Sequence, residues 1–119
     1  MDSPFIILVV EDEQLVRFVA VEALSERGFQ VLEAEHAAAA LGVLERLLPH
    51  VLFTDVHMPG EMSGIELAEL ASARHPAMKI IITSALPLAR PVDHLTAHFL
   101  RKPYAVSELH TAVDTALRA

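Results

Sequence analysis

Short apolar runs separated by longer amphipathic segments constrain the fold of this chain more than any other feature of its sequence. The runs are too short for ordinary helices, and Gly, Pro or polar residues bound them, which is typical of strands buried in a parallel sheet. We therefore predict five strands. They occupy residues 5–10, 30–33, 51–54, 79–83 and 99–102.

The segments between these strands carry helical periodicity. The predicted helices occupy residues 13–27, 36–48, 65–74 and 106–118. Gly28, Pro49 and Pro76 stand at or just beyond three of the helix ends, as helix-terminating residues do. Strands that alternate with helices over such short connections predict an α/β fold, a doubly wound five-stranded parallel sheet with helices on both faces.

Residues 86–97 depart from this alternation. Seventeen residues separate Ser84 from Lys102, and Pro87 and Pro91 fall among them. A helix of three turns with two connections barely fits this length, and proline disrupts a helix interior. We expect an abbreviated fourth helix that is short, displaced or partly disordered.

Composition narrows the class of protein. A chain of 119 residues with 53% hydrophobic residues fits one cored domain. It has no cysteine, which excludes disulfides, thiolate zinc sites and cysteine nucleophiles. A formal net charge of −7 disfavours direct binding of nucleic acid. No apolar run reaches the roughly 18 residues of a membrane span, and no basic residue precedes the first run, so we expect a cytoplasmic protein with no membrane contact.

Polar residues directly follow four of the predicted strands. They are Glu11 and Asp12 after the first strand, Asp55 after the third, Ser84 after the fourth and Lys102 at the end of the fifth. Open α/β sheets bind ligands at this edge. Alone, Asp12 would be read as a helix cap, but several carboxylates that converge repel one another and need a cation. Oxygen ligands favour Mg²⁺.

These residue types also fit phosphoryl transfer. With a metal bound, Asp55 can attack an electrophilic phosphoryl group, Lys102 can balance charge on the phosphoryl oxygens, and Ser84 can hydrogen-bond one of them. Without phosphoryl transfer, the same residues form a simple divalent-cation site.

The ordered set of residues resembles the receiver domain of two-component response regulators, over essentially the whole chain, 1–119. The matching motifs are Glu11-Asp12, Asp55 followed by Met58-Pro59 and Gly64, Ser84-Ala85, Phe99, and Lys102-Pro103. The resemblance implies a flavodoxin-like strand order, 2-1-3-4-5, and a cis peptide bond before Pro103. It also implies that Asp55 accepts a phosphoryl group from a histidine kinase or a histidine phosphotransfer protein.

The resemblance further implies roles for individual residues. Asp12, Asp55 and the backbone carbonyl of His57 would bind Mg²⁺ directly, and Glu11 would act through water. Ser84 and Phe99 would form the switch that alters partner binding. No enzymatic activity is implied beyond assistance to the domain's own phosphorylation and dephosphorylation.

Two other functions fit these residues poorly. A haloacid-dehalogenase-type phosphohydrolase needs a second Asp where this chain has His57. A flavodoxin needs a hydroxyl- and glycine-rich loop to bind phosphate, whereas Glu11, Asp12 and Glu13 would repel it. The alternative that stays open is a receiver-like protein-interaction module that works without phosphorylation.

The first predicted helix carries more apolar residues than one buried face requires. At 100° per residue, a stripe that can face the sheet contains Val16, Val19, Ala20, Ala23 and Leu24. Leu15, Phe18 and Val21 fall outside this stripe. In the receiver family this helix binds kinases and phosphotransfer proteins, so Leu15 and Phe18 are candidate docking residues. A homodimer contact is the rival use.

Overall fold

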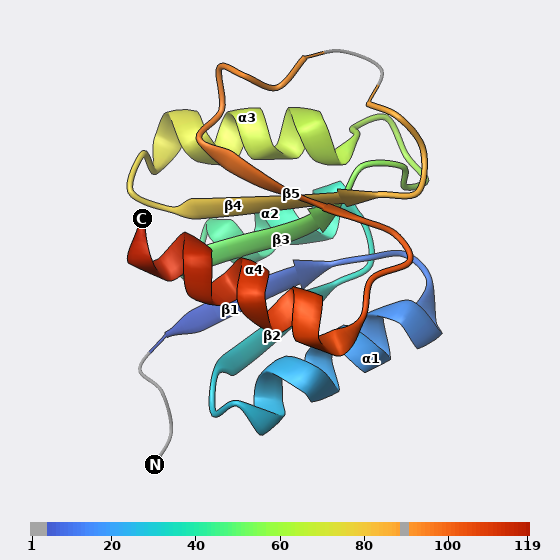
Figure 1. Ribbon diagram of the computed structural model, residues 1–119. Coiled ribbons are helices and arrows are strands. Elements are labelled where there is room, and N and C mark those ends of the chain that lie inside the picture. The colour runs from blue at the N-terminus through green and yellow to red at the C-terminus, as the bar shows by residue number, and fades with distance from the viewer. Residues whose placement is uncertain (1–4, 89–90) are drawn as a thin grey trace.

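The computed structural model describes residues 5–88 and 91–119 and contains a five-stranded sheet. The strands are β1 (Ile6–Val10), β2 (Gln30–Ala34), β3 (Val51–Asp55), β4 (Lys79–Ser84) and β5 (Ala97–Arg101). They lie in the order β2-β1-β3-β4-β5, and every pairing is parallel (Figure 1). The predicted doubly wound sheet with order 2-1-3-4-5 is confirmed.

Two layers of helix cover the sheet. The helices are α1 (Gln14–Glu26), α2 (Ala37–Leu44), α3 (Gly64–Arg74) and α4 (Val106–Arg118). Helices α1 and α4 lie on one face of the sheet, and α2 and α3 lie on the other (Figure 1). The peptide bond between Lys102 and Pro103 is cis, as expected.

Alternation along the strands produces two separate cores. Successive side chains of a strand point to opposite faces of the sheet. Leu8 of β1 therefore packs in the cluster under α2 and α3, whereas its neighbours Ile7 and Val9 pack in the cluster under α1 and α4. The central strands β1, β3 and β4 are almost fully buried, so their carboxyl ends are held in fixed positions at one edge.

Helix α2 is shorter than predicted, because it ends at Leu44 rather than at residue 48. Its buried residues Ala37, Ala40 and Leu44 form a complete core-facing stripe. Leu47 and Leu48 are 40% and 53% exposed, so a longer helix would have gained no further burial from them.

The described residues between β4 and β5, 85–88 and 91–96, form no helix. Leu95 is buried in the cluster on the α2 and α3 side, and Leu88 and Val92 pack against it, so an irregular segment covers this part of the sheet. Strand β5 also begins earlier than predicted, at Ala97, and ends at Arg101. Whether a helical turn includes residues 89–90 lies outside the described residues.

The predicted buried stripe of α1 needs correction at Val19. Ala20, Ala23 and Leu24 are buried as expected, but Val19 is 50% exposed. Val21 instead packs against the core cluster that α1 shares with α4. The helix is rotated from the expected orientation because it contacts both the sheet and α4.

Gly64, the first residue of α3, lies unusually close to the end of β3. A Cβ atom at this position would lie 1.8 Å from the carbonyl oxygen of Asp55 and 2.7 Å from its carbonyl carbon. The Gly64 N–H also donates a hydrogen bond to the Val56 carbonyl, at 2.9 Å. The absence of a side chain therefore lets α3 start directly against the residue that ends β3.

Gly64→Ala tests this close contact. Overpacking of this kind costs on the order of 1–3 kcal/mol, so we expect the free energy of unfolding to fall by about 2 kcal/mol in urea denaturation. Gly42→Ala in α2 is the matched control, since a Cβ there meets no atom within 4 Å. It should raise the free energy of unfolding by up to about 1 kcal/mol, because alanine favours helix. Equal effects of the two changes would show that the Asp55 carbonyl does not restrict position 64.

Candidate metal centre at the carboxyl edge of the sheet

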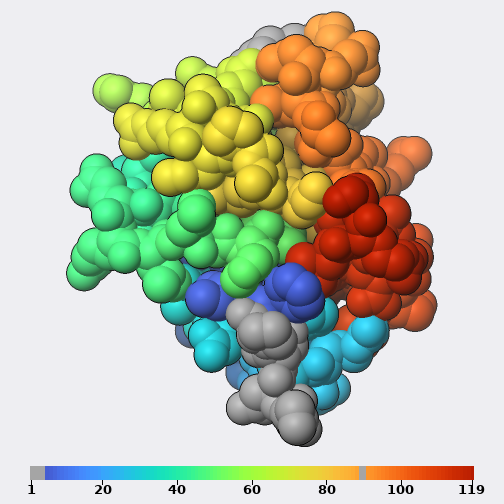
Figure 2. Space-filling model, turned by 90° about the vertical axis from the view of Figure 1, so that its left-hand side faces the viewer, coloured from blue at the N-terminus to red at the C-terminus, as the bar shows by residue number. Residues whose placement is uncertain are grey.

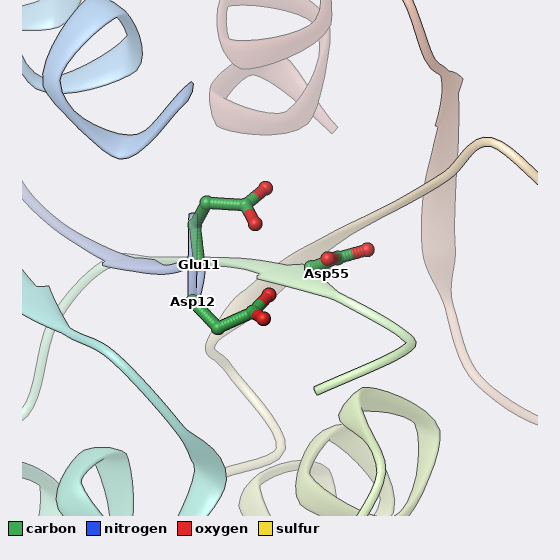
Figure 3. Close-up of side chains that lie close together, drawn as sticks. All are labelled: Glu11, Asp12 and Asp55. Carbon is green, nitrogen blue, oxygen red and sulfur yellow. The ribbon is translucent and has the colours of Figure 1, made fainter. Parts of the chain in front are cut away.

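Three carboxylates meet where β1 and β3 end. Glu11 and Asp12 directly follow β1, and Asp55 is the last residue of β3 (Figure 3). One carboxylate oxygen from each residue lies within 4.8 Å of the other two. Glu11 and Asp55 are 4% and 6% exposed, whereas Asp12 is open to solvent. This set of oxygen donors suits a hard divalent cation such as Mg²⁺.

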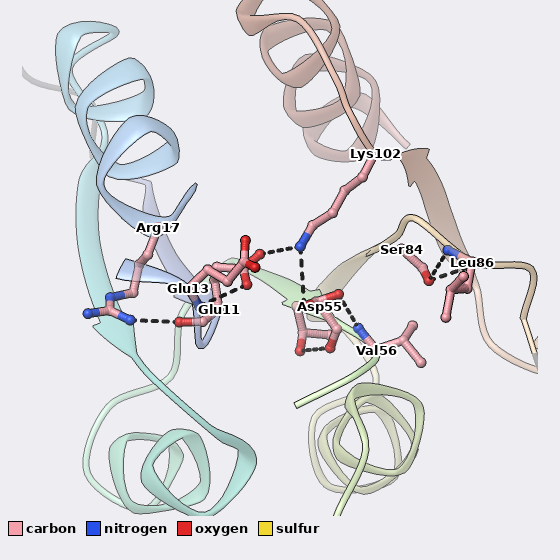
Figure 4. A network of polar contacts seen from close by, with 9 residues as sticks. Glu11, Glu13, Arg17, Asp55, Val56, Ser84, Leu86 and Lys102 are labelled. Atoms are coloured by element: carbon pink, nitrogen blue, oxygen red, sulfur yellow. Dashed lines mark hydrogen bonds and ion pairs between the residues drawn. The ribbon is translucent and has the colours of Figure 1, made fainter. Parts of the chain in front are cut away.

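Lys102 connects the two buried carboxylates. Its Nζ lies 2.6 Å from Oε1 of Glu11 and 3.2 Å from Oδ2 of Asp55 (Figure 4). The lysine follows β5, so residues from the ends of three strands share one ammonium group. Because buried charges are stable only when they are paired, each of these groups depends on the others.

Burial and charge shift the ionisation of this cluster. Burial, together with the nearby charge of Asp55, raises the pKa of Glu11, although Lys102 and the Glu13 N–H oppose the shift. Burial alone lowers the pKa of Lys102, but the hydrogen bond to Glu11 and the charges of Asp55 and Glu11 raise it overall. The cluster thus holds three carboxylates, and its one ammonium contacts two of them. The excess negative charge favours a bound cation.

Backbone donors orient both buried carboxylates. The Glu13 N–H donates to Oε2 of Glu11 at 3.2 Å, and the Val56 N–H donates to Oδ1 of Asp55 at 2.9 Å (Figure 4). Arg17 holds the same turn from outside, since its Nη1 donates to the Glu11 carbonyl at 2.7 Å and its Nε to Glu33 at 3.0 Å. The acidic site is therefore positioned by the backbone as well as by its own charges.

The hydroxyl of Ser84 has other partners than the acidic cluster. Its Oγ accepts a hydrogen bond from the Leu86 N–H at 3.1 Å and donates to the Leu86 carbonyl at 2.9 Å (Figure 4). Ser84 is buried, whereas Phe99 on the neighbouring strand β5 is 48% exposed. Phe99 pairs with Ile82 of β4, two residues before Ser84, and the hydrogen bonds of the Ser84 hydroxyl go to Leu86 and not to the acidic cluster.

His57 lies beside the site and is exposed. A hollow of about 380 Å³ has both Asp12 and His57 in its wall, next to the turn that contains Pro59 and Gly60. The outer side of the carboxylate cluster is therefore open to a small ligand.

Tyr104 and Arg17 also lie near the site, and the sequence did not identify either of them as a site residue. The ring of Tyr104 packs edge-on against Phe53, with centroids 5.9 Å apart. Burial, and then the charge of Glu11, raises the pKa of Tyr104 to about 12. The position of Tyr104 directly after Lys102-Pro103 could have indicated that it lies near the site. No sequence feature indicated Arg17, because its contact with Glu11 is to a backbone carbonyl.

An apolar groove of about 490 Å³ runs from the site along α1. It lies between α1 and the segment that follows β5, and its walls are Leu15, Val16, Val19, Ala85, Lys102, Pro103 and Tyr104. Leu15 is 80% exposed, and Phe18, outside the groove on the same helix, is 59% exposed. Both predicted docking residues are thus available on the surface.

Among the described residues, no helix is both long and apolar enough to cross a membrane.

Comparisons with known proteins agree with this geometry. The family model described as "Response regulator receiver domain" matches residues 7–114. The sensor kinase CckA of Brucella abortus (strain 2308) is 37% identical over 117 residues, covering 93% of this chain. The DNA-binding transcriptional regulator NtrC of Escherichia coli (strain K12) is 33% identical over 116 residues, covering 94% of this chain. The chain spans only 12% and 24% of these two relatives, respectively.

Solved structures show the same likeness. The receiver domain of the hybrid histidine kinase CckA superposes with a TM-score of 0.81 at 32% identity, covering 94% of this chain and 98% of that one. A response regulator receiver protein from Pseudomonas putida superposes with a TM-score of 0.85 at 28% identity, covering 97% and 99%. The family match over most of the chain, together with the shared fold, shows that this protein belongs to the response regulator receiver domain family.

Proposed function

We propose that this receiver domain, residues 1–119, accepts a phosphoryl group on Asp55 from a phosphohistidine in a Mg²⁺-dependent reaction. The donor is a histidine kinase or a histidine phosphotransfer protein in the cytoplasm. The observation that carries the proposal is the cluster of Glu11, Asp12 and Asp55 around Lys102 at one edge of the sheet. The proposed role is a signalling switch, without enzymatic activity toward other substrates.

The proposed metal roles are those that the resemblance to receiver domains implies. Asp12 and Asp55, with the backbone carbonyl of His57, would ligate Mg²⁺, and Glu11 would act through water because Lys102 already occupies one of its oxygens at 2.6 Å. When bound, the cation neutralises the oxygens of the transferred group and lowers the repulsion between that group and the carboxylates.

Two contacts would hold the Asp55 carboxylate in place for its proposed attack on phosphorus. The Val56 N–H fixes Oδ1, and Lys102 contacts Oδ2. A carboxylate oxygen forms the new O–P bond while the P–N bond to the donor histidine breaks, and the histidine nitrogen keeps that electron pair. Lys102 can then turn its remaining N–H groups toward the phosphoryl oxygens.

The switch would begin at Ser84. To donate to a phosphoryl oxygen, its hydroxyl must give up the hydrogen bond that it donates to the Leu86 carbonyl. That exchange frees the start of the irregular segment between β4 and β5 and lets Phe99 change its exposure. Partner binding would thereby depend on the state of Asp55, and a downstream protein target would read the altered surface.

A phosphorylation-independent interaction module is the second candidate. The closed Ser84–Leu86 contact favours it, because a module that never engages phosphate needs no free hydroxyl. The two candidates differ in one observable: only the first requires Asp55 to become modified.

Asp55→Asn tests the phosphoacceptor. After incubation with acetyl phosphate and Mg²⁺, the intact mass of the wild type should rise by one phosphate, and the mass of the variant should not change. Chelation of Mg²⁺ should abolish the gain in the wild type, because the acidic site then lacks its counter-charge. Modification that persists in Asp55→Asn would remove the assignment. No modification of the wild type by either acetyl phosphate or a kinase would favour the interaction module.

Leu86 controls the predicted lifetime of the phosphoryl group. Family members use the side chain two residues beyond the hydroxyl residue to orient the attacking water, and Leu86 is apolar and 59% exposed. We expect slow self-dephosphorylation, and Leu86→Asn or Leu86→Glu should accelerate it about tenfold or more by supplying a hydrogen bond to water. Leu47→Glu, which alters a leucine that is 40% exposed elsewhere, should leave the rate unchanged. Equal rates in the Leu86 variants and the wild type would contradict the prediction.

Leu15 and Phe18 are the proposed docking residues of α1. Leu15→Asp and Phe18→Asp should each slow phosphorylation by a cognate kinase, on the order of tenfold, because an apolar contact is replaced by a charge. Phosphorylation by acetyl phosphate should keep its rate, since the small donor needs no docking surface. If α1 instead mediates a homodimer, the same variants will change the sedimentation of the free protein and leave the kinase-dependent rate intact.

A further inference from the structure

A second groove lies at the opposite end of the sheet, where the strands begin. Its volume is about 450 Å³. Figure 2 views this end of the molecule, where the segment before β3 (green), the segment around residues 74–79 (yellow) and the end of α4 (red) come together. The lining residues fall into two chemical kinds. Phe5, Leu48, Met78 and Leu117 are apolar, and His50, Arg74, His75 and Lys79 are basic.

The charge of this groove contrasts with the rest of the chain. The protein has a formal net charge of −7, yet the groove is lined by no Asp or Glu among the described residues. Lys79 donates to the backbone carbonyl of Ala119 at 2.8 Å and so caps the end of α4, which leaves two ammonium N–H groups for other partners. Within the described part of the chain, Arg74 makes no ion pair.

His50 is a preorganised hydrogen-bond donor in the groove. Its backbone bonds to Ile6 at 2.8 Å and to Lys79 at 2.9 Å. Its Nδ1 accepts a hydrogen bond from the Ile6 N–H at 3.0 Å, and its ring packs edge-on against Phe5 with centroids 5.1 Å apart. In the neutral ring the proton must therefore lie on Nε2, which has no partner among the described residues.

The apolar lining adds a second requirement for a ligand. Leu48 is 53% exposed even though it lies beside the buried Met78. A ligand that contacted only the cationic side chains would leave Leu48 exposed. A ligand that also covered Leu48 would remove apolar surface from water. A ligand that satisfies the whole groove must combine negative charge with an apolar side chain.

We propose that this groove binds an acidic peptide segment of a partner protein, with an apolar side chain against Leu48 and carboxylates on Arg74, Lys79 and His50. The concave shape and apolar walls favour a peptide over a nucleic acid or a flat anionic membrane. The groove is lined by residues at the start of β4 and just before β1 and β3, whereas Asp55 ends β3, so the inference is independent of the phosphorylation chemistry.

The test titrates ¹⁵N-labelled protein with a blocked ELDFE pentapeptide and follows amide shifts by NMR. We expect saturable shifts at Phe5, Leu48, His50, His75 and residues 77–79, weaker binding at higher salt, and at least tenfold weaker binding of a blocked KLKFK peptide. Arg74→Glu and Leu48→Ser should each weaken binding of ELDFE at least fivefold. Arg101→Glu on β5, the same change of charge at the other end of the sheet, should not affect it.

The inference would be overturned by the absence of shifts at millimolar ELDFE, by shifts spread over all exposed basic residues, or by equal effects of Arg74→Glu and Arg101→Glu. Stronger shifts at the same groove with a single-stranded oligonucleotide or with anionic vesicles than with ELDFE would assign it to a nucleic acid or a membrane, and would also overturn the peptide proposal. The spectra report whether each variant is folded, so loss of binding is separable from loss of structure.

Discussion

The carboxyl edge of this protein depends on the ion pairs of Lys102. Its ammonium lies 2.6 Å from Glu11 and 3.2 Å from Asp55, so these pairs join the ends of β1, β3 and β5. Without this charge, two buried carboxylates would face each other unpaired, which is costly in a protein interior. The lysine compensates only part of the local negative charge. The same contacts therefore pair the two buried carboxylates and leave an excess of negative charge that favours a cation.

The rest of the fold holds these three strands in register. Central strands buried on both faces cannot slide, because a shift of one residue would turn every core side chain outward. Gly64 lets α3 start directly against the backbone carbonyl of Asp55, the proposed phosphoacceptor. The Val56 N–H holds the Asp55 side chain. The described residues between Ser84 and β5 form no helix, and the proposed switch begins at the start of this segment.

The two ends of the sheet differ in charge and in proposed role. The carboxyl ends of the strands carry the acidic cluster, and the opposite end carries His50, Arg74 and Lys79 around an apolar floor. Parallel strands with returning helices separate these ends by the full length of the sheet. The proposed phosphorylation site and the proposed peptide-binding groove therefore lie apart on one small domain, without direct interference between them.

Local sequence patterns determined the strands and the acidic residues at their ends, because these depend on burial periodicity and on the residue that follows a strand. The order of the strands was predicted from the family resemblance. Tertiary structure decided the rest. Helix α2 ended at Leu44 once its core stripe was complete, and Val19 turned outward because α1 also packs on α4. The Ser84 hydroxyl bonded to Leu86, and the basic groove formed from segments far apart in sequence. Such features depend on which surfaces meet, and no local pattern in the chain encodes those meetings.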